Sequence, residues 1–253
     1  MNKTFPSLML LLISNTAVAE LTEQAPVWIP KHFPEMLPIK AGDFMMGCVT
    51  KRDEVEAGCQ SDEKPAHKVT LKSFEVSKTE ITVGQFRVFI KQTGYKTSAE
   101  KGKGCYLYKN NKWDKVKNAN WDKPNFKQTE EHPVTCVSWD DSQAYIKWLN
   151  SQVNTKALGK YRLLTEAEWE YAARGGETEQ AYPWGNKAHH DWANYGKDSC
   201  CSPLKSGKDQ WDYTAPVARF PANGFGLHDM HGNVWEWVQD KYQDNYKKAL
   251  SNQ

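Results

Sequence analysis

The sequence predicts an α+β fold with little regular secondary structure, and three observations support this prediction. Three segments begin with helix-capping residues and continue with apolar residues at helical spacing. One segment, His67 to Val76, alternates apolar and polar residues as a strand does, with a slip that indicates a possible bulge. The residues after Gly176 are rich in Gly, Asn, Asp, Pro and aromatic side chains, and they show no sustained period before Trp235. A loop stretch of this length is normally functional or held by something specific.

The N-terminal residues predict a secretory signal peptide over residues 1–19. Lys3 supplies a short basic start, Leu8 to Ile13 form an apolar run, and Ala17 to Ala19 are the small residues typical of a cleavage point. A membrane span needs about 20 apolar residues, so this run is too short to be an anchor, and no later stretch is apolar enough. We therefore expect a periplasmic or secreted protein without a membrane span, starting near Glu20.

The remaining chain divides into an extended segment, residues 20–38, and one domain, residues 39–253. The first segment contains four prolines and little periodicity. The whole chain has 33 Lys and Arg against 31 Asp and Glu, and this balance gives no basic surface for nucleic acid or for an anionic membrane. The 11 tryptophans bury large areas and suit a loop-rich fold whose irregular parts are pinned by aromatic rings.

Within the domain, an apolar segment from Ile39 to Gly47 precedes a first cysteine loop, and the alternating strand follows it. The first predicted helix begins at the capping box of Thr82 and Gln85 and ends at Gly94. Ser138 with Asp141 starts the second helix. Thr165 with Glu168 starts the third, which Gly175-Gly176 ends. The expected apolar faces are Val83, Phe86, Phe89 and Ile90; Ala144, Tyr145, Trp148 and Leu149; and Trp169, Ala172 and Ala173.

Cysteines in an exported chain are expected to form disulfides. Cys48 and Cys59 bracket a polar loop, and Cys105 and Cys136 flank a polar insertion, so each pair would close a loop. None of the six cysteines lies in a motif that places a base beside a thiol, which argues against a catalytic thiol.

Cys200 and Cys201 are adjacent in the sequence. A strained bridge between them, pairing elsewhere and metal binding all remain open.

Seven segments, in chain order, match the motifs of one known family. They are Ala41–Gly47, Asp62–His67, Lys78–Thr82, His132–Asp141, Arg162–Gly175, Tyr182–Gly185 and Phe225–Trp237. Through these segments the chain resembles the formylglycine-generating enzymes or sulfatase-modifying factors. The fifth nearly reproduces the family signature, with Leu164 in place of a proline. The resemblance implies a loop-rich variant of the C-type lectin fold.

The resemblance also implies a family reaction, the copper- and O2-dependent oxidation of a sulfatase cysteine to formylglycine. The family holds its copper ion with two cysteines around and after an R-G-G-S-W element, and this sequence shows no such element before Gln253. We therefore assign no catalytic residue in this chain, regard the domain as incomplete at its C-terminal side, and expect copper only where a complete catalytic segment is present.

Calcium is the cofactor that the resemblance predicts for this chain, at two family sites. Hard cations prefer carboxylate, amide and backbone oxygens at irregular turns. The first site consists of Asp229, Gly232, Val234 and Glu236. The second consists of Asn194, Tyr195, Asp209 and Trp211, where Tyr195 and Trp211 would offer only backbone oxygens. The alternative for both sets is turn capping in a metal-free loop.

Histidines give a weaker metal signal. His228 and His231 have H-x-x-H spacing, and His189 and His190 are adjacent. Zinc would need further ligands at defined spacing, so packing or surface positions are the favoured interpretation.

Three functional hypotheses follow. The first is an exported, calcium-stabilised accessory or binding module, or part of a longer protein, that does not form formylglycine by itself. The second is an oxidase whose remaining segment another chain supplies. The third, an iron-dependent oxygenase-like activity, ranks last because that branch uses a histidine triad from an added N-terminal domain, which residues 20–38 are too short to hold. The expected partner is a sulfatase-like or other exported protein.

Overall fold

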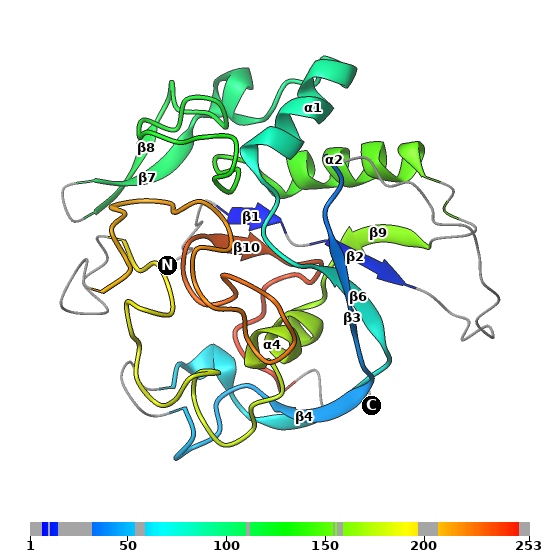
Figure 1. Cartoon of the computed structure of the whole chain (residues 1–253), viewed down its shortest axis with the longest axis vertical. Coiled ribbons are helices and arrows are strands. Elements are labelled where there is room, and N and C mark those ends of the chain that lie inside the picture. The colour runs from blue at the N-terminus through cyan, green and yellow to red at the C-terminus, as the bar shows by residue number, and fades with distance from the viewer. Residues whose placement is uncertain are drawn as a thin grey trace.

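The computed structural model describes residues 7–9, 11–14, 32–53, 59–109, 112–153, 155, 159–196 and 207–247 of the 253-residue chain. The described residues include three α-helices, α1 (Val83–Thr93), α2 (Trp139–Gln152) and α4 (Glu166–Arg174), together with short helical turns at Ser61–Glu63 and Ala99–Lys103. The strands are β1 (Ser7–Met9), β2 (Leu11–Ser14), β3 (Met36–Ile39), β4 (Gly42–Met46), β5 (His67–Leu71), β6 (Phe74–Ser77), β7 (Cys105–Lys109), β8 (Lys112–Val116), β9 (Lys160–Leu163) and β10 (Trp235–Trp237). This mixture confirms the α+β prediction (Figure 1).

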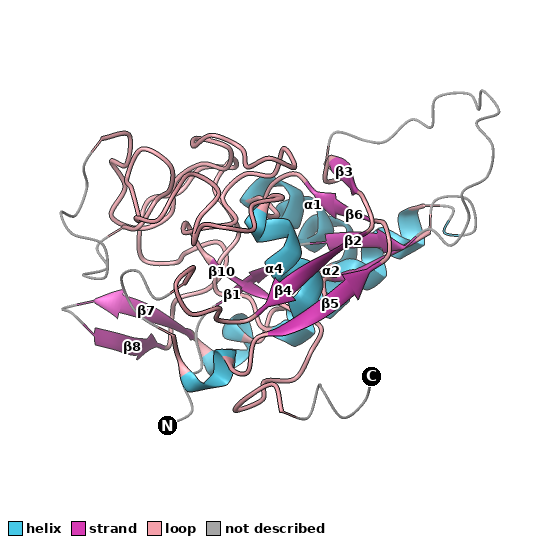
Figure 2. Ribbon diagram, turned by 90° about the horizontal axis from the view of Figure 1, so that it is seen from below, coloured by secondary structure: helices cyan, strands magenta, loops and turns pink. Residues whose placement is uncertain are grey.

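The strands form small sheets. One has four antiparallel strands in the order β3-β6-β2-β9, so β6 aligns Val76 with Leu12 on one side and with Leu37 on the other. β4 pairs with β5 and β7 with β8, both antiparallel, while β1 and β10 run parallel. Figure 2 shows long loops gathered mainly to one side of these strands and helices.

The alternating segment His67 to Val76 is two strands, so the prediction of one strand with a bulge is wrong. β5 pairs with β4, whereas β6 pairs with β3 and β2 in a different sheet. The slip in the alternation falls at Lys72 and Ser73, which lie between the two strands. Sequence alternation reports which side chains are buried, not which sheet each half joins.

The segment assigned to residues 20–38 is part of the folded domain where the structure describes it. Phe33 is 5% exposed in the main apolar cluster, and β3 begins at Met36 and pairs with β6. Phe33 and β3 therefore pack with the rest of the described domain.

β1 and β2 lie within the predicted signal peptide, so its removal has a structural consequence. We expect N-terminal sequencing of the exported protein to begin at Glu20. The processed chain would then lack β2, and the amide protons of β6 and β9 should exchange faster than in the unprocessed chain, because both strands lose their shared neighbour. An exported protein that still begins at Met1 would contradict the assignment.

All three predicted helices are confirmed, with their capping boxes. The Thr82 side chain accepts a hydrogen bond from Gln85 N at 3.2 Å, and Gln85 Oε1 accepts one from Thr82 N at 2.9 Å. The same reciprocal pattern starts α2 at Ser138 and α4 at Thr165.

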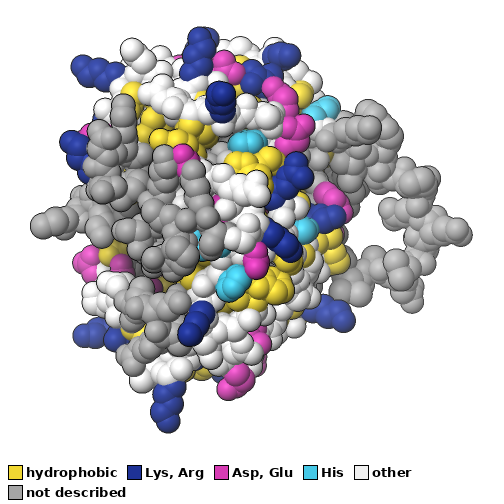
Figure 3. Space-filling model, turned by 60° about the vertical axis from the view of Figure 1, so that its left-hand side comes forward, with side chains coloured by type: hydrophobic (Ala, Val, Ile, Leu, Met, Phe, Trp, Pro, Cys, Tyr) yellow, Lys and Arg dark blue, Asp and Glu magenta, His cyan; other side chains and the backbone are white. Residues whose placement is uncertain are grey.

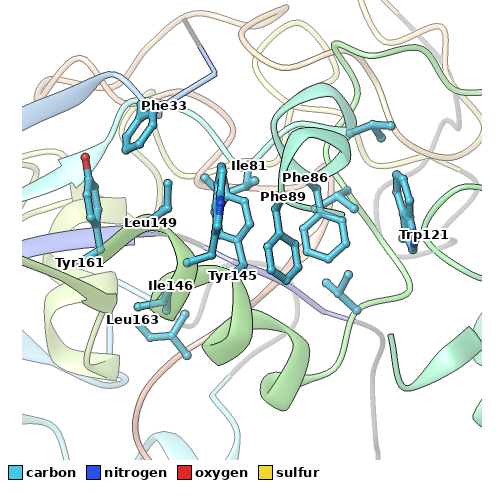
Figure 4. Close-up of a cluster of buried hydrophobic side chains, with 14 residues drawn as sticks. Phe33, Ile81, Phe86, Phe89, Trp121, Tyr145, Ile146, Leu149, Tyr161 and Leu163 are labelled. Carbon is cyan, nitrogen blue, oxygen red and sulfur yellow. The ribbon is translucent and has the colours of Figure 1, made fainter. Parts of the chain in front are cut away.

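The main core lies between α1 and α2. Phe86 stacks on Tyr145 with ring centroids 5.7 Å apart, and Phe89 meets the edges of both rings at 5.2 and 5.6 Å. Figure 4 shows these rings pointing toward one another between the helices. A second cluster, which includes Ile39, Val76 and Leu164, packs β3 and β6 against α4.

Both predicted disulfides are present. Cys48 is bonded to Cys59 and Cys105 to Cys136, with Cα–Cα distances of 5.6 and 5.3 Å. Cys200 and Cys201 lie outside the described residues. No helix among the described residues is long and apolar enough to cross a membrane.

A candidate calcium site

A buried acidic cluster lies where the loop from 225 to 237 meets the start of α1. Asp229 comes from this loop, Glu236 from β10, and Glu80 from the segment that leads into α1. Glu80 is 0% exposed and Asp229 is 7% exposed. Carboxylates are almost never fully buried unless they are paired, so this group indicates a missing positive partner.

Each of the three carboxylates has one satisfied oxygen and one that lacks a hydrogen-bond partner within the described part of the chain. Asp229 Oδ2 accepts from Ala218 N at 2.7 Å, and Glu236 Oε2 accepts from Trp169 Nε1. Glu80 Oε1 accepts from Asn233 Nδ2 at 3.0 Å. The remaining oxygens are Asp229 Oδ1, Glu236 Oε1 and Glu80 Oε2.

The electrostatics of the cluster are unfavourable without a cation. Burial raises the pKa of Glu236 to about 8, and the negative charge of Asp229 adds to this rise. Burial also raises the pKa of Asp229, and burial together with Asp229 and Glu236 raises the pKa of Glu80 well above its ordinary value. Buried charge without a partner is costly, and a divalent cation would remove that cost while using the unpartnered oxygens of Asp229 and Glu236. The first predicted set therefore fits calcium.

The loop backbone has the shape that such a site needs. Asp229, Gly232 and Asn233 have positive φ values of 59°, 102° and 58°. A left-handed backbone turns the chain sharply, so consecutive carbonyls need not point the same way. A Cβ atom on Gly232 would lie 2.5 Å from the carbonyl oxygen of Asn194, so only glycine fits this position.

Glu80 was not predicted as a site residue. The only signal in the sequence was its place in the Lys78–Thr82 motif. Among the described residues, the oxygens of Glu80, Asp229 and Glu236 are not close enough together to hold one ion as a set of three. The predicted ligands, two carboxylates with the carbonyls of Gly232 and Val234, thus remain the candidate set, and Glu80 adds negative charge beside it.

Asn233 connects this site to the loop that carries the second predicted set. Its Oδ1 accepts from Ala215 N at 2.8 Å and from Asn194 Nδ2 at 3.1 Å, and its backbone N donates to Asn194 O at 2.8 Å. Its Nδ2 also donates to Glu80. One amide side chain therefore fixes three separate segments around the acidic cluster.

The second predicted set is brought together, but its side chains are already hydrogen-bonded. Asn194 is 3% exposed and Asp209 is 1% exposed. Asn194 Oδ1 accepts from Gly196 N, and the Asp209 carboxylate accepts from His190, Tyr195 N and Trp211 N. This set does not fit a cation as the first set does.

The histidines lie in packing and surface positions. His228 Nδ1 is 2.9 Å from Phe220 O, and His189 is 58% exposed. His231 packs edge-on against Tyr182 and Trp184, and burial lowers its pKa to about 4. Where the chain is described, the residues close enough to form a metal-binding group are Cys48, Cys59 and Glu63, and two of these are joined in a disulfide.

An aromatic hollow opens next to Asp229. Trp184 is stacked between Tyr182 and Trp192, with centroids 5.2 and 5.9 Å away, and His231 and Asn223 also line the hollow. Figure 3 shows hydrophobic and histidine side chains on one face of the molecule, with acidic and basic side chains interspersed. The hollow itself is bordered by the rings of Trp184, Trp192 and His231 together with the Asp229 carboxylate.

The fold and the site together define a loop-rich, disulfide-containing α+β domain with a cluster of acidic side chains beneath its loops. Residues 22–253 match the sequence model of the sulfatase-modifying factor enzyme 1-like domain. The chain belongs to this family, the formylglycine-generating enzyme family.

Known relatives agree with this assignment. The chain is 35% identical to the formylglycine-generating enzyme of Mus musculus over 83% of its own length, and 32% identical to the inactive C-alpha-formylglycine-generating enzyme 2 of the same organism, also over 83%. Among solved structures, it resembles PvdO from Pseudomonas aeruginosa at 34% identity with a TM-score of 0.67, covering 87% of this chain and 76% of that one. The chain spans 59% of the length of the first of these relatives and 70% of the second.

Proposed function

We propose that this chain is an exported, calcium-stabilised domain of the formylglycine-generating enzyme family that does not oxidise cysteine by itself. One observation carries the proposal. The four cysteines in the described part of the chain, Cys48, Cys59, Cys105 and Cys136, are joined in two disulfides. Copper(I) chemistry of the family type needs soft thiolate ligands in a preformed site, and these sulfurs are not thiolates.

Cys200 and Cys201 are a poor substitute for the family's copper ligands. They are adjacent in the sequence, and the short tether between them disfavours the near-linear two-thiolate geometry that copper(I) prefers. Without a thiolate pair, the features of the domain that could support a function are the candidate calcium site and the aromatic hollow. Both suit an accessory or binding role toward a sulfatase-like or other exported protein.

The relatives support either role for a family member. One is named as a formylglycine-generating enzyme and another as an inactive one, at 35% and 32% identity. Overall sequence identity therefore does not separate active from inactive family members. The deciding feature is whether a pair of cysteines is available as thiolates.

We expect no conversion when the purified chain is incubated with copper, oxygen and a peptide that carries a sulfatase-type cysteine. Mass spectrometry would search for the change from cysteine to aldehyde. A known active family enzyme under the same conditions is the positive control. Robust turnover by this chain alone would contradict the proposal, and turnover lost in Cys200→Ser or Cys201→Ser would move the catalytic centre to those residues.

A second candidate function is an oxidase that is completed by another polypeptide segment. Its support is the 35% identity to a relative named as the enzyme. The same assay separates the two functions. Turnover that appears only when a segment with R-G-G-S-W and a cysteine pair is supplied would favour the completed oxidase over the accessory module.

A further inference from the structure

The second predicted calcium set contains a carboxylate whose two oxygens both have protein partners. Asp209 Oδ2 lies 2.7 Å from His190 Nδ1 and accepts from Tyr195 N at 3.0 Å, and Oδ1 accepts from Trp211 N at 3.3 Å. Asp229 Oδ1, in the first set, has no such partner in the described part of the chain. The two sets therefore differ in whether a cation is needed to satisfy a buried carboxylate.

The Asn194 side-chain amide of the second set also has protein partners for both its oxygen and its nitrogen. Asn194 Oδ1 accepts from Gly196 N at 2.9 Å, within its own turn. Its Nδ2 donates to Tyr213 O at 2.6 Å and to Asn233 Oδ1 at 3.1 Å. A calcium ion between Asn194 and Asp209 would have to displace several of these bonds, each made in a buried setting where an unpartnered group is costly.

His190 contacts two members of the second set, Asp209 and Tyr195. Its side chain is 5% exposed, its backbone carbonyl accepts from Asp209 N at 3.1 Å, and its ring meets the Tyr195 ring edge-on at 5.4 Å. Because a carboxylate only accepts hydrogen bonds, Nδ1 carries the proton in the bond to Asp209. The imidazole thus joins the loop around 190–196 to the loop around 207–211, which is the role a bound ion would have.

We propose that the His190 imidazole takes the place of a second calcium ion, so that this chain binds at most one calcium. The single ion belongs to the Asp229 and Glu236 site. The loops of the second set are held by the pair of His190 and Asp209, whether or not calcium is present. This inference rests on the proposed calcium-stabilised domain only for the identity of that one ion.

Metal content after saturation with calcium and removal of excess ion tests the stoichiometry. We expect one calcium per chain in the wild type, one in Asp209→Asn and none in Asp229→Ala, which removes the ligating oxygen altogether. Two calcium ions in the wild type, or the loss of one ion in Asp209→Asn, would overturn the inference. No calcium in the wild type would contradict the proposed function but would agree with a second set that needs no ion.

An NMR measurement keeps the inference testable if Asp209→Asn does not fold. The Nδ1–H resonance of His190, assigned by its absence in His190→Gln, should stay in place when calcium is added to chelated protein. A resonance that moves or disappears on calcium addition would show that the ion competes for Asp209, and the inference would then fail.

Discussion

Calcium should raise the melting temperature of the chelated protein, and Glu236→Gln should remove this gain. A ligand that binds only the folded state at a hundred times its Kd adds about 2.7 kcal/mol of stability. For a chain of this size, each kcal/mol corresponds to roughly 2–4 °C. The expected gain in melting temperature is therefore about 5–10 °C. Circular dichroism would measure the melting temperature first in chelator and then with excess calcium.

In chelator, by contrast, Glu236→Gln should melt at a higher temperature than the wild type. Glu236 is half-buried, and its Oε1 is buried without a hydrogen-bond partner in the described part of the chain. Because its pKa is raised to about 8, the metal-free protein must either take up a proton at this carboxyl on folding or carry an uncompensated charge there. The neutral amide avoids both costs and should raise the melting temperature of the metal-free protein. Glu179→Gln, at an exposed position, is the matched control and should leave both the calcium response and the metal-free stability unchanged. A wild-type melting curve that does not respond to calcium would refute the site.

Gly232→Ala should be strongly destabilising, by about 3 kcal/mol, and should abolish the calcium response. Two costs act together. The φ value of 102° is one that residues with a Cβ rarely adopt, and the new Cβ atom would lie 2.5 Å from Asn194 O. Relief of that contact would move the loop that carries Asp229 and Glu236. Denaturant unfolding and a calcium titration would measure both effects.

Gly94→Ala separates the two costs. Gly94 ends α1 with φ 64°, and a Cβ atom added there would have nothing within 4 Å, so only the left-handed strain of about 1 kcal/mol applies. Its calcium response should match the wild type. If Gly232→Ala were no more damaging than Gly94→Ala, the close approach of Gly232 to Asn194 would not be what shapes the site.

The parts of the fold that were predicted correctly obey local rules. The helix starts at Thr82, Ser138 and Thr165 depend on hydrogen bonds between residues three apart. The family motifs, read in order, predicted the fold type. The split of His67 to Val76 into β5 and β6 was missed, because the choice of sheet depends on partners far away in the sequence.

The candidate site was predicted only in part, for the same reason. The motif supplied Asp229 and Glu236, but Glu80 meets Asn233 across 153 positions, and no local pattern marks that contact. The resemblance also implied a calcium site at the second set, with less support than at the first. It did not predict that His190 would satisfy Asp209, 19 positions later.

Residue identities alone thus determined the starts of the three helices, the two cysteine pairs and the oxygen-rich loops, since each depends on short-range chemistry or on closing a polar loop. The tertiary structure decided which buried carboxylates have partners and which do not. That outcome depends on how distant segments pack: Ala218, Trp169 and Asn233 each satisfy one oxygen of the first cluster, while His190, Tyr195 and Trp211 between them satisfy both oxygens of Asp209. Of the two clusters, only the first is left with buried carboxylate oxygens that have no partner in the described part of the chain.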